Sequence, residues 1–122
     1  MTESSLNLAV IFRTAPHGSA RGREGLDLLL LSASYDQQCA AVFIGDGVYQ
    51  LCQGQQPGLI DAKDYIATFK ALPLYDVDTV VVCAESLQQR GLTAEQLVLP
   101  VSRCTPSEIA GLLANSQQVL TF

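Results

Sequence analysis

Apolar residues along this chain fall into short continuous runs that alternate with amphipathic stretches. Three runs, at residues 6–12, 39–44 and 79–84, are apolar almost throughout. Strands that are covered by helices on both faces show this pattern, whereas half-exposed strands alternate with polar residues. Residues 97–102 predict an edge or irregular strand, because Pro100 lacks a backbone donor. A short strand is also predicted at residues 118–122.

The stretches between these runs have helical spacing and helix-end signals. Residues 24–34, 62–69 and 85–90 each predict a helix; Asp61 caps the second, and Pro73 and Gly91 stop the second and third. Thr93 and Gln96 predict one further capped turn. Thr105 is followed by proline and then by Glu108, which indicates a strong helix start. Strands and helices thus alternate, which predicts an α/β fold.

The predicted architecture is a three-layer α/β/α sandwich with a mostly parallel sheet of about five strands. The chain has 122 residues and no internal repeat, so residues 1–122 are expected to form a single domain. A prominent core is expected, because 48% of the residues are hydrophobic and only 16% are charged.

The charge balance and the apolar runs limit the function classes. The net charge is −5 and the pI is about 4.5, the opposite of a protein that grips nucleic acid through phosphates. No apolar run approaches the roughly 20 residues that cross a bilayer, and residues 1–5 lack the basic cluster of a secretory signal. We therefore expect a cytoplasmic protein that binds neither nucleic acid nor membranes directly.

The cysteines are scattered through the sequence. Cys39, Cys52, Cys83 and Cys104 contain no CxxC pair, and the single histidine, His17, is remote from all of them in sequence. This spacing argues against a disulfide framework and against a structural metal. No cofactor is expected either.

Cys83 is the candidate functional thiol. Parallel sheets gather reactive groups at the carboxyl ends of their strands, and Cys83 ends the run at residues 79–84, just before a helix. A thiolate there is the species that accepts or donates a sulfane sulfur. The alternative is a small buried core residue beside three valines. A nucleophilic pair would further require that His17 approach Cys83 in space.

Two other features suggest binding. Glycines at positions 18, 22 and 25 and arginines at positions 21 and 23 match neither GxGxxG nor GxxxxGK[ST], so the segment from residue 14 to residue 25 is interpreted as a flexible loop that attracts anions or faces a partner. A small-molecule site on this loop remains an alternative. Tyr49 and Tyr75 are either interface anchors or ordinary rim aromatics.

Several longer motifs point to one family. They are Thr14-Ala-Pro-His-Gly, Gly22-Arg-Glu-Gly-Leu-Asp, Asp46-Gly-Val-Tyr-Gln-Leu, Asp64-Tyr-Ile-Ala-Thr-Phe-Lys, Leu74-Tyr-Asp, Val82-Cys-Ala, Arg90-Gly-Leu and Leu120-Thr-Phe. In this order and at these spacings, the whole chain resembles the TusC/DsrF branch of the DsrE family.

The resemblance implies a subunit of a sulfurtransferase complex. In such a complex, TusB-like and TusD-like subunits join this one in a heterohexamer that relays persulfide sulfur to a downstream carrier protein, towards 2-thiolation of the tRNA wobble uridine. Dsr relatives serve sulfur oxidation instead. The sulfur-bearing cysteine belongs to the D or E subunit, at a strand end equivalent to Cys83, while the C or F subunit is regarded as non-catalytic. The alternatives are a stand-alone sulfur carrier that uses Cys83, and a homo-oligomer when the chain is isolated.

Overall fold

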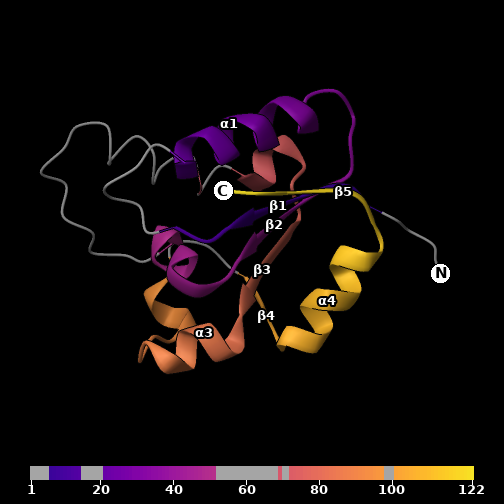
Figure 1. Ribbon diagram of the computed structural model, residues 1–122. Coiled ribbons are helices and arrows are strands. Elements are labelled where there is room, and N and C mark those ends of the chain that lie inside the picture. Colours follow the sequence, from indigo (N-terminus) through magenta and orange to yellow (C-terminus); the bar gives the residue numbers. More distant parts are fainter. Residues whose placement is uncertain (1–5, 15–20, 52–68, 70–71, 98–100) are drawn as a thin grey trace, which may run out of the picture.

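The protein folds around one parallel β-sheet (Figure 1). The computed structural model describes residues 6–14, 21–51, 69, 72–97 and 101–122. The strands are β1 (Leu6–Phe12), β2 (Cys39–Phe43), β3 (Thr79–Cys83), β4 (Ser102–Cys104) and β5 (Ser116–Thr121). They lie in the order β4-β3-β2-β1-β5, and every neighbouring pair is parallel. The predicted α/β fold class and its mostly parallel five-stranded sheet are therefore confirmed.

Helices cover both faces of the sheet. They are α1 (Arg21–Ala33), α3 (Ala84–Gln89) and α4 (Pro106–Ala114), and short 3-10 helices span Gly45–Leu51, Leu72–Tyr75 and Ala94–Gln96. In Figure 1, α1 lies along one side of the sheet and α4 along the other. Because β4 and β5 form opposite edges, the segment that contains α4 carries the chain across the whole sheet.

Alternate residues of the strands supply two separate cores. On the α1 face, Phe12 of β1 stacks on Phe43 of β2 with ring centroids 4.8 Å apart, and the ring of Phe69 meets both edge-on at 5.5 and 5.6 Å. On the α4 face, the smaller cluster is built around Val42, Val81 and Ile109. The three phenylalanines are fully buried, so the larger core lies under α1.

The first helix begins earlier than the sequence suggested. It starts at Arg21 rather than near residue 24, so the segment from Arg21 to Gly25 is helical and the predicted loop is wrong there. Packing explains why Gly25 occurs within this helix. A Cβ on Gly25 would lie 2.9 Å from ring atoms of both Phe12 and Phe122. Glycine thus lets the helix approach the sheet closely, which is why it is tolerated inside the helix.

The fourth strand is also displaced from its predicted place. Pairing with β3 occurs at Ser102–Cys104, so Ser102 alone belongs to the predicted range of residues 97–102. The prediction followed the apolar run, but Leu97 is buried in the core before the ladder begins. The predicted edge position is confirmed. The helix predicted at residues 62–69 lies outside the described residues apart from Phe69, which is helical.

The helix predicted after Thr105 is confirmed in detail. The Thr105 hydroxyl accepts from the Glu108 N–H at 3.2 Å, and the Glu108 carboxylate accepts from the Thr105 N–H at 2.8 Å. Pro106 occupies the first turn, where its missing N–H costs nothing. None of the helices in the described part of the chain is both long enough and apolar enough to cross a membrane.

Candidate functional site

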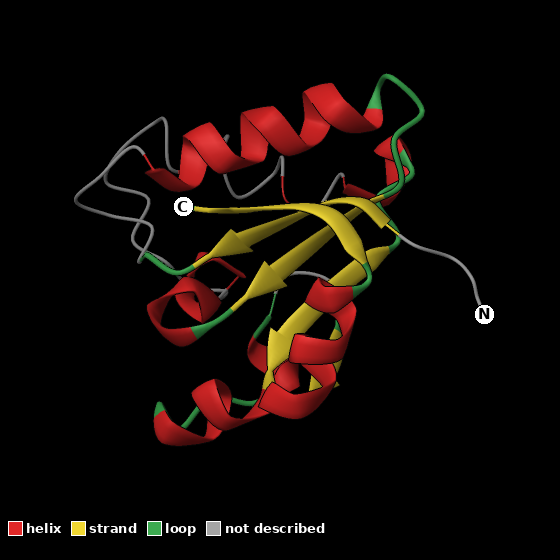
Figure 2. Cartoon of the chain, turned by 45° about the vertical axis from the view of Figure 1, so that its right-hand side comes forward, coloured by secondary structure: helices red, strands yellow, loops and turns green. Residues whose placement is uncertain are grey.

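The carboxyl ends of β1, β2 and β3 come together at one edge of the sheet, and Figure 2 shows their ends from a second direction. β2 leads through Gly45 into the 3-10 helix Gly45–Leu51, and β3 leads directly into α3. Gly45 has φ of 58°, a left-handed conformation that glycine adopts without strain. The apolar run predicted at residues 39–44 thus ends at this turn, which continues as a 3-10 helix.

Gly47 lies against the end of β1. Its N–H donates to the Ile44 carbonyl at 2.9 Å, and the Ile44 N–H donates to the Phe12 carbonyl at 3.1 Å. A Cβ on Gly47 would stand only 1.7 Å from that Phe12 oxygen. Any side chain would therefore collide with backbone, so glycine alone fits this contact.

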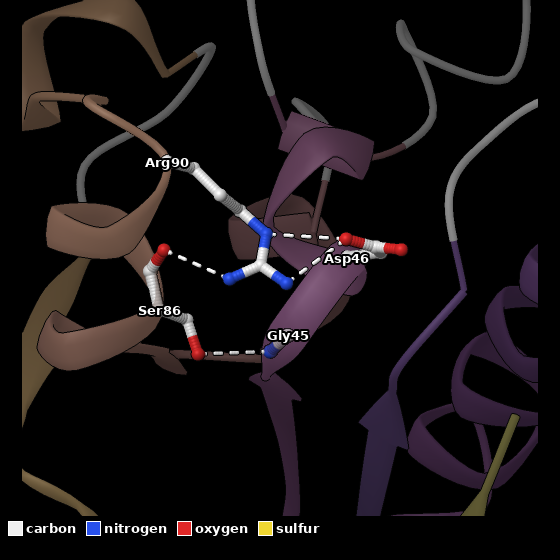
Figure 3. A network of polar contacts seen from close by, with 4 residues as sticks. All are labelled: Gly45, Asp46, Ser86 and Arg90. Carbon is white, nitrogen blue, oxygen red and sulfur yellow. Dashed lines mark hydrogen bonds and ion pairs between the residues drawn. The ribbon is translucent and has the colours of Figure 1, made fainter.

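An arginine clamp joins the segments that follow β2 and β3 (Figure 3). Arg90, just after α3, donates from Nε and Nη2 to Asp46 Oδ1 at 3.1 and 2.9 Å. Its Nη1 donates to the Ser86 carbonyl at 3.1 Å, while Ser86 Oγ accepts from the Gly45 N–H at 2.9 Å. The guanidinium carbon also lies 6.0 Å from the centroid of the Tyr49 ring. The clamp thus holds the two strand ends in a fixed relation.

The end of β1 is tied to the same 3-10 helix. Gln50 is fully buried, and its Nε2 donates to the Thr14 carbonyl at 2.9 Å. The sequence placed Arg90 and Gln50 in family motifs but assigned no role to them or to Ser86, because local pattern does not show which residues meet across the sheet edge.

Cys83 is the last residue of β3 and the N-cap of α3, as the sequence predicted. Its side chain makes no capping hydrogen bond and is only 4% exposed. It packs in the α4-face cluster with Ile11 and Ile109. The thiol is therefore covered by protein, as expected of the core-residue alternative, although the strand-end position agrees with the functional hypothesis.

The sequence pattern does not mark Cys104 as functional, but the structure places it beside Cys83. The two residues are direct partners in the parallel ladder between β3 and β4. Cys104 is partly exposed, and burial together with the Glu108 carboxylate raises the pKa of its thiol. Cys39 lies apart, paired with Leu8, and burial raises its thiol pKa too. The sequence analysis placed the fourth strand at residues 97–102, before Cys104, and therefore did not predict that Cys104 pairs with Cys83.

The remaining candidates do not assemble into a site within the described residues. His17, Gly18 and Cys52 lie outside those residues. Arg21 and Arg23 are exposed on α1 rather than on a loop. Among the residues that the structure describes, no three histidine, cysteine or acidic side chains are grouped as metal ligands would be.

Both tyrosines that the sequence suggested as interface residues are described. Tyr49 is half-buried beneath Arg90, and Tyr75 is 47% exposed in the 3-10 helix Leu72–Tyr75. Of these two tyrosines, only Tyr75 is exposed, so the residues around Tyr75 are the better candidates for an interface.

Comparison with known proteins gives a consistent result. The model of the DsrE/DsrF-like family matches residues 7–122. Two proteins named "Protein TusC homolog", from Vibrio vulnificus strains CMCP6 and YJ016, are 50% identical over 115 residues, which is 94% of this chain and 98% of each relative. A third of the same name, from Vibrio parahaemolyticus, is 45% identical over the same shares.

A solved structure resembles the fold. The crystal structure of the ychN protein from E. coli superposes with a TM-score of 0.79, covering 96% of this chain and 99% of that one. The two sequences are 22% identical, so the likeness bears on the fold alone.

Proposed function

We propose, because this chain belongs to the DsrE/DsrF-like family, that it is an accessory, non-catalytic subunit of a TusBCD-type sulfur-relay complex. Its partners would be TusB-like and TusD-like subunits in a heterohexamer in the cytoplasm. The complex would pass persulfide sulfur to a downstream carrier protein, towards 2-thiolation of the tRNA wobble uridine. The observation that carries the proposal is 45–50% identity to proteins named "Protein TusC homolog" over nearly the full length of each.

The burial of Cys83 supports an accessory role. Sulfur transfer requires that a thiolate reach the sulfur atom of a partner. At 4% exposure, the Cys83 thiol is closed off by the α4-face cluster. Arg90 also joins the end of α3, the helix that follows Cys83, to Asp46 in the segment after β2. These features suit a subunit that shapes a neighbour's site better than one that carries sulfur.

Exposed apolar side chains support the proposed partner subunits. The largest ones are Leu31 (56% exposed), Tyr35 (71%), Leu74 (85%) and Tyr75 (47%). Leu31 lies in α1 and Tyr35 in the turn that follows it, and α1 contacts the 3-10 helix that carries the other two. Apolar and aromatic residues of this kind are enriched where proteins meet. The net charge of −5 further favours protein partners over RNA.

A second candidate function is a stand-alone sulfur carrier that uses Cys83. It is favoured by one observation, that Cys83 ends β3 at the carboxyl edge of the sheet, where the family resemblance puts the sulfur-bearing cysteine. A DsrF-like subunit in sulfur oxidation is a variant of the leading proposal. The genes that neighbour this one would separate that pathway from tRNA thiolation.

The test is native mass spectrometry of the tagged chain, purified gently from its own cells. Three forms are compared: the parent, Cys83→Ser, and the matched control Cys39→Ser, whose cysteine is 5% exposed against 4% for Cys83. Thiouridine in the tRNA of each strain is measured in parallel.

The accessory proposal expects two small partner subunits in equal amounts, with the mass of an added sulfur atom on a partner only. Both serine variants should then keep the parental level of thiouridine. If the chain is purified alone, or if the added sulfur lies on Cys83 and thiouridine disappears only in Cys83→Ser, the stand-alone carrier replaces the leading proposal.

A further inference from the structure

The two cysteines at the ends of β3 and β4 occupy one rung of the sheet. Cys83 and Cys104 are paired residues of neighbouring parallel strands, and both thiols are free in this structure. Paired residues on adjacent strands lie about 4.8 Å apart and project their side chains to the same face. Disulfides join residues whose Cα atoms are about 4.4–6.8 Å apart, so this rung falls within their reach.

Packing agrees with that geometry. Cys83 belongs to the buried cluster on the α4 face, and Cys104 packs against the same cluster. Both thiols therefore lie under α4, near Ile109. Their exposures differ, because Cys83 is buried while Cys104 is partly open to solvent. A reagent in solution would meet Cys104 first.

We propose that Cys83 and Cys104 form an oxidisable dithiol, in which Cys104 reacts with hydrogen peroxide and Cys83 closes the disulfide. In the first step the Cys104 thiolate attacks a peroxide oxygen, the O–O bond breaks, and the leaving hydroxide takes a proton to become water. In the second step the Cys83 thiolate attacks the Cys104 sulfur, the S–S bond forms, and the S–O bond breaks to release a second water. Two thiols and one hydrogen peroxide thus give one disulfide and two waters.

Two features of the structure should make oxidation of the pair slow and reversible. Burial and the Glu108 carboxylate raise the pKa of Cys104, so little of the reactive thiolate is present near neutral pH. Neighbouring strands lie about 4.8 Å apart, whereas the Cβ atoms of a disulfide lie about 3.5–4.5 Å apart. Closure therefore requires a shift of the three-residue edge strand β4, and the bond should be easily reduced. The inference is independent of the proposed sulfur-relay function.

Trypsin makes the test unambiguous. Cleavage after Lys70, Arg90 and Arg103 places Cys83 in the peptide of residues 71–90 and Cys104 in that of residues 104–122. Cys39 and Cys52 share a third peptide, residues 24–63. The reduced full-length protein is treated with hydrogen peroxide, alkylated, digested and analysed by mass spectrometry.

The expected result is a linked peptide pair, 71–90 with 104–122, at a yield that does not depend on protein concentration. Cys104→Ser should slow oxidation of Cys83 by about tenfold or more, because the exposed thiol is gone. Cys83→Ser should leave a sulfenic acid on Cys104 that a dimedone-type probe traps. Cys39→Ser is the control and should behave as the parent. Glu108→Gln keeps the helix cap but removes the charge, so oxidation should be faster on the order of twofold.

A measurement on the parent protein guards against a misfolded variant. Phenylarsine oxide bridges two neighbouring thiols and releases one water, so it should protect Cys83 and Cys104 together from alkylation. The proposal is overturned if peroxide oxidises Cys104 without forming the linked pair, if Cys83 oxidises equally fast in Cys104→Ser, or if the linkage forms only between molecules. Failure of phenylarsine oxide to protect both thiols would also count against it.

Discussion

Replacing Gly47 with alanine should destabilise the protein sharply. The added Cβ would lie 1.7 Å from the Phe12 oxygen, 2.4 Å from its carbonyl carbon and 3.0 Å from the Arg13 nitrogen. Side-chain carbons essentially never come within 3.0 Å of such atoms, so backbone must move by more than an ångström. That movement strains the junction of β1 with the 3-10 helix Gly45–Leu51. Overpacking of this kind costs about 3 kcal/mol.

Urea unfolding followed by circular dichroism measures the cost. Gly111→Ala is the matched control, because Gly111 lies in α4 and an added Cβ there would meet nothing within 4 Å. That change should stabilise the protein by about 0.5–1 kcal/mol, since alanine restricts the unfolded chain. An unchanged slope with denaturant would show that the midpoints report stability. If Gly47→Ala unfolds within about 0.5 kcal/mol of the parent, the close backbone contact does not constrain this edge and the reasoning is wrong.

Three smaller effects should be measurable in the same way. Thr105→Ala removes the helix cap and should cost about 1 kcal/mol; no loss would mean that the cap is redundant. Asp46→Asn should cost less than about 1 kcal/mol, because the Asp46 side chain is 60% exposed, and the difference should shrink in 1 M salt. Burial raises the pKa of Cys39 above the ordinary 9.0, so its contribution to stability is complete below about pH 9 and is lost as pH rises through the folded-state pKa. Cys39→Ala should therefore flatten the alkaline decline of the unfolding free energy, and an equal decline in both proteins would assign it to other groups.

The strands were predictable from sequence where local pattern decides them. The apolar runs that became β1, β2 and β3 end within one residue of their predicted limits, because both faces of a central strand must be buried. The helix start at Thr105 was equally local, since its hydrogen bonds join residues three positions apart. The start of α1 was predicted too late because glycines such as Gly25 usually indicate a loop. In this helix, Gly25 instead allows close packing against Phe12.

Less of the candidate site could be predicted from the sequence. Cys83 was placed correctly at its strand end, but its burial depends on α4, which packs from a distant part of the chain. The pairing with Cys104 depends on the register between β3 and β4, which local pattern does not encode for a three-residue edge strand. The contacts of Arg90 with Asp46 likewise join segments that are adjacent only in space.

The sheet order has a consequence for biosynthesis. β1, near the start of the described chain, pairs along one side with β5, and an Asn7–Gln117 hydrogen bond spans a separation of 110 residues. On the ribosome, β1 emerges early and keeps that side uncovered until β5 has been made. A nascent chain with an open apolar strand edge is prone to wrong pairings. Chaperone binding to stalled nascent chains should therefore persist until Thr121 has left the exit tunnel, and then fall as the first strand receives its last neighbour.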